Sequence, residues 1–260
     1  MMIKIMNIPF EIMGIQLNSA WRKFITDDLH TNFKIHVLSD NTGRYGIETF
    51  NIADGDKKCF RYNSEIMLAD QEWKEITILP PIHYQDIEVF IIQAFYKHAL
   101  QCNGIQIHCS IIDYKRQGLL FVGPSGIGKT TQAELWHRYK KATIINGDIG
   151  FIQKKLECFY AWGTPWHGSS VYCENMNVPI KALIVLQKGK EDKIRELKDF
   201  EKLVKVADNV FYPEWIEQGL GKCFSLLSDL LSIVPVYELS CRPDEEAVEL
   251  TEKTIFGREH

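Results

Sequence analysis

The stretch Gly123-Pro124-Ser125-Gly126-Ile127-Gly128-Lys129-Thr130 decides the fold of this chain. It follows the apolar run Leu119-Leu120-Phe121-Val122 and precedes a segment of helical character, residues 130–139. A strand, a glycine-rich turn and a helix in this order form a P-loop, whose backbone N–H groups converge on the phosphates of a nucleotide. The sequence therefore predicts a nucleotide-binding site.

The residue types of the loop suit a triphosphate and its metal ion. Glycines allow the backbone N–H groups to crowd inward, Lys129 brings a positive charge to the β and γ phosphates, and Thr130 offers a hydroxyl to Mg²⁺. The alternative is a glycine-rich turn with an incidental lysine. We expect ATP and Mg²⁺ as cofactors, with nucleotide contacts from Gly123, Ser125, Gly126, Ile127, Gly128, Lys129, Thr130 and Thr131.

An acidic residue at the end of a neighbouring strand is the usual partner of a P-loop, because it holds Mg²⁺ directly or through water. Asp148 fits this place, since it follows the apolar segment 142–145. Thr130 and Asp148 are thus the predicted metal ligands. The structural alternative for Asp148 is a turn residue in Asn146-Gly147-Asp148, because Asn-Gly is a common turn signal.

Bulk composition narrows the class of protein. The chain has 260 residues, 45% of them hydrophobic, and a net charge of −4, which predicts a globular protein and argues against nucleic acid as a partner. No run of about 18 uncharged residues predicts a membrane helix, and residues 1–10 suggest a first strand rather than a signal peptide. Seven scattered cysteines suit a reducing compartment, so we expect a cytoplasmic protein without a membrane partner.

The pattern of hydrophobic residues changes along the chain. Short alternating segments such as 33–38 and 75–79, with turn signals at 41–43 and 54–56, precede a stretch of helical spacing at 84–101. We therefore expect a β-rich N-terminal region, 1–100, that ends in an amphipathic helix. The P-loop domain is then 101–260.

Two adjacent strands lead into the P-loop. Apolar residues alternate with polar ones over 105–111, a turn-like stretch follows at 113–118, and 119–122 runs into the loop. An antiparallel pair beside the nucleotide site points away from GTPases, transport ATPases and nucleoside kinases. Further strands are predicted at 142–145, 150–153, 156–162, 182–187 and 234–241, with helices at 199–207, at 221–232 and from about 243.

The segments 108–114 and 118–130 together resemble the C-terminal catalytic domain of the HPr kinase/phosphorylase family. The shared features are a histidine-bearing strand, a short turn and a loop with the core Ser125-Gly126-Ile127-Gly128-Lys129. The resemblance is strongest over about residues 100–170. It implies an α/β (α+β) fold, namely a phosphoenolpyruvate-carboxykinase-like P-loop domain with a mixed sheet, preceded here by the small β-rich part.

The resemblance also implies roles for three predicted catalytic residues. His108 matches a histidine near the γ phosphate, Lys129 a phosphate-binding lysine, and Asp148 one member of an aspartate pair that serves the metal and the acceptor hydroxyl. Here the pair reads Gly147-Asp148, so one aspartate is absent. Either Asp148 does both jobs in turn or His108 accepts the proton. From spacing alone, His108 could also be a structural residue of its strand.

The loop Gly163-Thr164-Pro165-Trp166-His167-Gly168-Ser169-Ser170 concentrates unusual residues. Glycines near both ends and Pro165 suit an ordered active-site loop, and a similar Gly-x-Pro-Trp segment occurs in HPr-kinase-like proteins of peptide-modification clusters. Trp166, His167, Ser169 and Ser170 are therefore predicted to face the substrate. The alternative places Trp166 in the core. Arg242 either reaches the nucleotide or caps the last helix.

Together these features predict an ATP- and Mg²⁺-dependent kinase that phosphorylates a serine of a protein or peptide. Two alternatives stay open: a non-catalytic nucleotide-binding regulator, in which the absent aspartate reflects lost chemistry, and a small-molecule kinase. A carboxykinase-like enzyme is disfavoured by the short chain. The resemblance also makes a homo-oligomer plausible.

Overall fold

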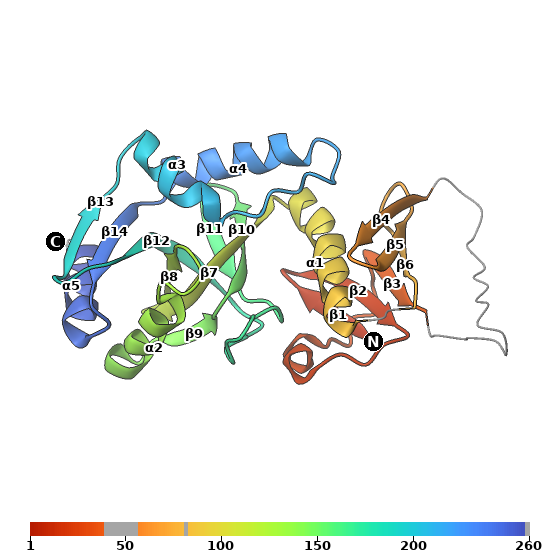
Figure 1. Cartoon of the computed structure of the whole chain (residues 1–260), viewed down its shortest axis with the longest axis horizontal. Helices are drawn as coiled ribbons and strands as arrows, with labels where there is room; N and C mark the ends of the chain where they lie inside the picture. The colour runs from red at the N-terminus through yellow and green to blue at the C-terminus, as the bar shows by residue number, and fades with distance from the viewer. Residues whose placement is uncertain (39–56, 81–82, 258–260) are drawn as a thin grey trace. The chain divides into compact units, whose positions relative to one another are not determined.

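A computed structural model describes residues 1–38, 57–80 and 83–257 of the chain (Figure 1). The chain divides into two compact units, Met1–Ala99 and Leu100–His260. The turns predicted at 41–43 and 54–56 lie outside the described residues. Together the units hold two sheets and five α-helices, so the chain is a mixed α/β protein.

The described part of the N-terminal unit is built on a six-stranded sheet of order β1-β2-β3-β6-β5-β4. Its strands are β1 (Met2–Ile5), β2 (Ile8–Met13), β3 (Phe33–Val37), β4 (Lys58–Tyr62), β5 (Glu65–Ala69) and β6 (Glu75–Ile78). A 3-10 helix, η1 (Ser19–Phe24), follows β2. The β2–β3 and β3–β6 pairs are parallel and the others antiparallel, so the sheet is mixed.

The start of the chain is a hairpin rather than the single strand that residues 1–10 suggest. Met6 and Asn7 both have positive φ, 53° and 61°, and they join β1 to β2 in antiparallel register. Two consecutive left-handed residues form the tight turn whose twist matches that of paired strands. The apolar run hides this turn, because Met6 is not a typical turn residue.

Helix α1 (Tyr84–Gln101) has the bounds that the sequence predicts. Its apolar side packs on the sheet of its own unit: the ring of Phe95 lies 5.8 Å from that of Phe10, and His98 stacks on Phe33 at 4.1 Å. Burial lowers the pKa of His98, whose Nε2 also lies 2.9 Å from the Trp73 carbonyl oxygen. Neither α1 nor any other described helix has the length and apolar character needed to cross a membrane.

The C-terminal unit is built on a second mixed sheet. Its strands are β7 (Gly104–Tyr114), β8 (Gln117–Val122), β9 (Thr143–Asn146), β10 (Ile149–Lys155), β11 (Cys158–Trp162), β12 (Asn177–Lys188), β13 (Lys193–Glu196) and β14 (Val236–Cys241). The order is β11-β10-β7-β8-β12-β14-β13, with β9 also paired to β7. Helices α2 (Lys129–Lys140), α3 (Phe200–Val206), α4 (Gly219–Ile233) and α5 (Glu245–Phe256) and the 3-10 helix η2 (Ala207–Asn209) complete the unit.

The antiparallel pair that leads into the P-loop is longer than the sequence predicts. The turn at 113–118 shrinks to Lys115 and Arg116, with φ of 55° and 61°, and Tyr114 pairs with Gln117. Strands β8, β12 and β14 are parallel to one another, so their carboxyl ends share one edge of the sheet. In open α/β sheets this edge is where ligands bind.

Helix α2 is held against the sheet by a buried aromatic cluster. Trp136 is fully buried, and its ring lies 5.2 Å from that of Tyr114 and 6.5 Å from that of Phe256 on α5. Close-packed interiors resist small displacements of their elements. The packing therefore fixes the position of the P-loop at the start of α2.

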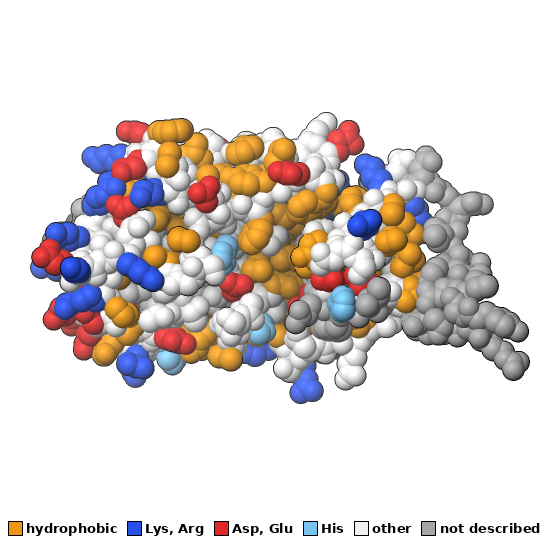
Figure 2. All heavy atoms as spheres, viewed as in Figure 1, with side chains coloured by type: hydrophobic (Ala, Val, Ile, Leu, Met, Phe, Trp, Pro, Cys, Tyr) orange, Lys and Arg blue, Asp and Glu red, His pale blue; other side chains and the backbone are white. Residues whose placement is uncertain are grey.

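Helices α3 and α4 carry an apolar surface, which Figure 2 shows as orange side chains over these helices. Its exposed members include Phe200, Val204 and Phe224. A cavity of about 630 Å³ lies beside them, lined by residues of both helices. From α3 the chain continues through η2 toward the P-loop.

We expect Trp136→Ala to lower the free energy of unfolding of the C-terminal unit by about 3–5 kcal/mol, because it leaves a cavity under α2. Chemical denaturation followed by circular dichroism measures the change. Leu156→Ala is the control: Leu156 is 92% exposed, so its removal should change stability by less than about 0.5 kcal/mol. Equal effects of the two substitutions would contradict the packing role.

Candidate functional site

The P-loop joins the end of β8 to the start of α2. Gly126 and Gly128 have φ of 75° and 113°, a region that other residues rarely adopt. Gly128 is the N-cap of α2, and within the described residues no side chain caps this helix. The first N–H groups of α2 are thus left for an anion, which the helix dipole also favours.

Lys129 lies inside the loop. Its Nζ donates to the carbonyl oxygens of Gly123, at 3.0 Å, and Pro124, at 3.3 Å. Burial lowers the pKa of Lys129, while the charge of Asp148 opposes this shift. A desolvated ammonium that is bonded only to two neutral carbonyls is stabilised further when a phosphate brings a full negative charge beside it. Lys129 therefore lies within hydrogen-bonding distance of two carbonyl oxygens of the loop.

The carbonyl oxygen of Gly147 joins the P-loop to the turn that carries Asp148. It accepts hydrogen bonds from Thr130 Oγ1, at 3.1 Å, and from the buried Ser110 on β7, whose Oγ lies at 3.0 Å. Thr130, one predicted metal ligand, is thus bonded to the residue that precedes Asp148, the other. Hydroxyl and carboxylate oxygens are the ligands that Mg²⁺ prefers, so these side chains fit that ion.

His108 and Asp148 form a direct pair. The Nε2 atom of His108 lies 2.8 Å from Asp148 Oδ1, and both side chains are about a third exposed, at 27% and 30%. The register of β7 and β10 sets this pair, because His108 lies opposite Ile149. The structure brings together the two residues that the sequence proposes for proton transfer.

Asn146 organises the turn around Asp148 and is fully buried. Its Oδ1 accepts from the backbone N–H groups of Asp148, at 2.8 Å, and Ile149, at 2.9 Å. Its Nδ2 donates to the carbonyl oxygens of Thr164, at 3.0 Å, and Trp166, at 3.2 Å. The amide of Asn146 therefore holds the conformation of both the turn 146–149, here called the aspartate turn, and the loop 163–170. In the sequence, Asn146 is recognisable only as part of the Asn-Gly turn signal.

The loop 163–170 packs directly on the aspartate turn. A Cβ atom on Gly168 would lie 2.3 Å from Asp148 Oδ2, and one on Gly147 would lie 2.0 Å from Ser170 Oγ. Ser170 thus fills the space that a side chain at position 147 would need. An aspartate at position 147 would therefore require the Ser170 side chain to move.

The four predicted substrate-facing residues of this loop differ in exposure. Trp166 is only 5% exposed, so it belongs to the core and does not project toward a substrate. His167 is half-buried, with Nδ1 bonded to the Ser170 backbone oxygen, and Ser169 is exposed. The half-buried Ser170 Oγ accepts from the Tyr172 N–H at 3.1 Å. His167 and Ser169 therefore form the accessible part of the loop.

Asn209, at the end of η2, is a site residue that the sequence did not reveal. Its buried Oδ1 accepts from the Gly123 N–H at 2.8 Å, which ties the first residue of the P-loop to the segment after α3. Two residues further on, the ring of Phe211 lies 6.4 Å from that of His108. The residues before and after Asn209 carry no motif, and 86 positions separate it from Gly123.

A cavity of about 400 Å³ adjoins the P-loop at the carboxyl ends of β12 and β14. Its lining residues come from the P-loop and α2, the end of β12, and the end of β14: Ile127, Gly128, Thr131, Gln132, Leu186, Gln187, Lys188, Gly189, Cys241, Arg242 and Pro243. Its volume is within the range of roughly 300–1,000 Å³ typical of small-molecule sites. Burial raises the pKa of Cys241 to about 11, so its thiol stays neutral near pH 7.

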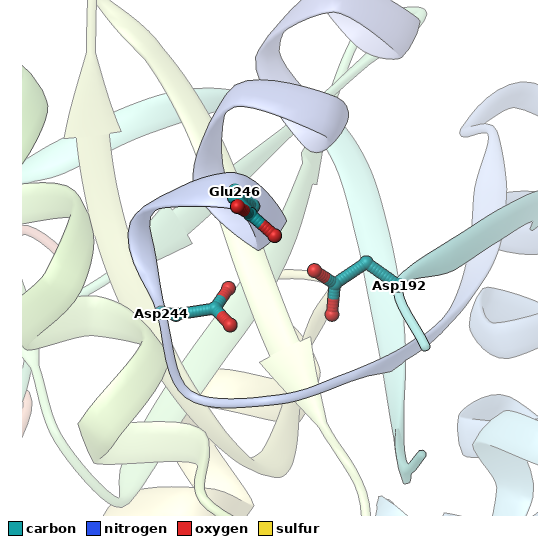
Figure 3. A group of neighbouring side chains, drawn as sticks. All are labelled: Asp192, Asp244 and Glu246. Carbon is teal, nitrogen blue, oxygen red and sulfur yellow. The ribbon is translucent and has the colours of Figure 1, made fainter. Parts of the chain in front are cut away.

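Arg242 sits at the rim of this cavity within a group of three acids. Figure 3 shows Asp192, Asp244 and Glu246 converging, with one oxygen from each within 4.8 Å of the others. The Arg242 guanidinium lies 3.7, 3.2 and 2.8 Å from these three carboxylates in turn. The three carboxylates therefore lie close together because each forms an ion pair with Arg242. Asp244, and not Arg242, caps α5, by accepting from the Ala247 N–H at 3.1 Å.

We expect Asn146→Ala to lower the free energy of unfolding by about 2–4 kcal/mol, because it leaves buried N–H and C=O groups without partners. Thermal or chemical denaturation measures the effect. The exposed Asn177→Ala is the matched control and should change stability by less than about 0.5 kcal/mol. A small effect of Asn146→Ala would show that its four contacts contribute little.

Comparisons with known proteins identify a family. The family model described as "SynChlorMet cassette protein ScmC" matches residues 80–242, more than half of the chain. No curated protein matches. The solved structure of the Hpr(Ser) kinase/phosphatase from Coxiella burnetii is similar over 59% of this chain and 95% of its own, with 11% identity and a TM-score of 0.34. The chain therefore belongs to the family of SynChlorMet cassette protein ScmC.

Proposed function

We propose that this protein is an ATP- and Mg²⁺-dependent kinase that transfers the γ-phosphoryl group to a serine hydroxyl of a protein or peptide. The observation that carries the proposal is the meeting of the P-loop with the His108–Asp148 pair, through the hydrogen bond from Thr130 to Gly147. This arrangement puts a phosphate site beside a pair that can accept a proton. Phosphoryl transfer needs little beyond such positioning and charge neutralisation.

The donor side of the site is the P-loop. Its backbone N–H groups and Lys129 bind the phosphates, and the cavity beside Ile127 and Gly128 holds the nucleoside. Thr130 and Asp148 would hold Mg²⁺, which supplies charge neutralisation on the phosphate oxygens when bound. Lys129 exchanges its bonds to the Gly123 and Pro124 carbonyls for bonds to the phosphates.

The acceptor serine approaches the His108–Asp148 pair. Its oxygen forms a bond to the γ phosphorus, the bond from that phosphorus to the β–γ bridging oxygen breaks, and ADP leaves. The serine proton passes to His108 or to Asp148, which share a hydrogen bond of 2.8 Å. Because the transition state is loose, a late transfer to this pair is sufficient. His167 and Ser169 offer the acceptor polar contacts at the edge of the site.

A single carboxylate distinguishes this site from the aspartate pair that the family resemblance implies. Ser170 occupies the space beside Gly147, so the protein has Gly147 and Asp148 where the resemblance implies two aspartates. The same observation favours a second candidate function, a nucleotide-binding regulator without turnover. The two functions differ in whether an acceptor stimulates ADP formation.

We expect Lys129→Met to weaken ATP binding by roughly 10- to 100-fold, because it removes a charge-assisted contact to phosphate. Isothermal titration calorimetry with ATP and Mg²⁺ measures the affinity. The exposed Lys141→Met, at the other end of α2, is the control with an equal change of charge and should bind ATP as the unmodified protein does. Equal affinities for all three proteins would remove the P-loop from the binding site.

We expect His108→Ala to slow phosphoryl transfer by roughly ten-fold or more while ATP affinity is retained, because His108 acts on the acceptor side. The measurement uses γ-labelled ATP with pools of serine-containing peptides, and the same pools with alanine at each serine. Asp148→Asn should lower turnover by about 100-fold or more. The exposed His36→Ala serves as the control for His108→Ala.

Two results would oppose this assignment. Full turnover in His108→Ala would return that residue to a structural role on β7. Tight ATP binding without ADP formation, with every serine pool, would favour the regulator over the kinase.

A further inference from the structure

We propose that the cavity beside the P-loop selects adenine nucleotides, and that the side-chain amide of Gln132 reads the base. The inference rests on the proposed function, because it assumes that the P-loop binds a nucleoside triphosphate. It adds the residue that selects the adenine base of ATP.

The cavity lies where a base attached to P-loop phosphates can reach. Ile127 and Gly128 of the loop line one side, and the ends of β12 and β14 line the other. Ile127, Leu186 and Pro243 offer apolar surface to the faces of a planar ring. Mostly apolar walls with a few polar groups are typical of sites for small molecules.

Gln132 is a buried polar residue of this lining, and only one end of its side-chain amide has a hydrogen-bond partner among the described residues. It lies on the first turns of α2 and is 3% exposed. Its Nε2 donates to Cys241 Sγ at 3.2 Å, and its Oε1 has no partner among the described residues. Sulfur is a weak acceptor, and a buried carbonyl without a donor is costly. A ligand that satisfies this amide therefore gains affinity.

Gln132 lines the cavity, and the torsion about its last side-chain bond is of a kind with broad preferences, so the amide can reorient to meet a ligand. The amide then presents an acceptor beside a donor. Adenine matches this pattern, because its N6 amino group donates and its N7 accepts, and glutamine binds both atoms together. Guanine presents two acceptors, O6 and N7, so Oε1 would face a like group.

The positively charged side chains that line the cavity do not change the preference for adenine over guanine. Arginine and lysine are the side chains that bind guanine O6 and N7. The Arg242 guanidinium is already engaged by Asp192, Asp244 and Glu246. Lys188 is exposed to solvent. The buried polar group left to read the base edge is thus the amide of Gln132.

The first test needs no substitution. Calorimetry compares ATP, GTP, purine riboside 5′-triphosphate, which lacks the N6 amino group, and inorganic tripolyphosphate. We expect ATP to bind roughly ten-fold or more tightly than both GTP and the purine riboside compound. Equal binding of ATP and purine riboside triphosphate would overturn the inference but leave the proposed function standing. Failure of all four ligands to bind would overturn both.

The second test assigns the selection to Gln132. In Gln132→Met we expect the ratio of ATP to purine riboside triphosphate affinity to fall to within about two-fold of unity, while tripolyphosphate binding is retained. Gln153→Met is the matched control: Gln153 is also buried, its Oε1 has no partner among the residues that the structure describes, and its Nε2 donates to the Cys102 carbonyl, outside the cavity. It should keep the full ratio.

A full ratio in Gln132→Met would show that another group reads the base. Should that variant fail to fold, Gln132→Leu provides the same comparison. Retained tripolyphosphate binding identifies a folded P-loop in either variant. The ligand series on the unmodified protein decides base selection in any case.

Discussion

The site depends on one buried amide, that of Asn146. Its oxygen accepts hydrogen bonds from the backbone N–H groups of Asp148 and Ile149. Its nitrogen donates hydrogen bonds to two backbone carbonyl oxygens of the loop 163–170. A fully satisfied buried amide holds one geometry, because every alternative leaves polar groups unpaired in a medium of low dielectric constant. The direction of the Asp148 carboxylate follows from this network. So does the burial of Trp166, whose carbonyl is one of the two acceptors.

The P-loop is joined to its surroundings at both ends. Thr130 bonds to the carbonyl of Gly147, and Asn209 accepts from the N–H of Gly123. Asn209 in turn donates to the carbonyls of Lys205 and Val206 at the end of α3. The phosphate site is thereby part of a continuous hydrogen-bonded structure that extends from the aspartate turn to the apolar face of α3 and α4.

Local sequence patterns predict much of the secondary structure. The periodicity of 84–101 predicted α1 with its bounds, and the alternation before Gly123 predicted the β7–β8 pair. The sequence does not predict the roles of three buried polar residues, Asn146, Asn209 and Gln132. Their hydrogen-bond partners lie 18, 86 and 109 positions away, and a single polar residue produces no periodic pattern. The prediction that Trp166 faces the substrate is wrong for a related reason. Neighbouring glycine and proline residues indicate a loop, but they do not indicate which side chains the loop buries. The hairpin at Met6 was missed because neither turn residue is glycine.

The close contact between Gly147 and Ser170 links two positions that are 23 residues apart, so neither can change freely without the other. An ancestor or descendant with two adjacent aspartates would need a smaller residue at 170, or a loop that follows a different path. A change at 147 alone would meet the Ser170 side chain. A two-carboxylate site in this fold would therefore require an adjustment of the loop 163–170 as well as a change at position 147.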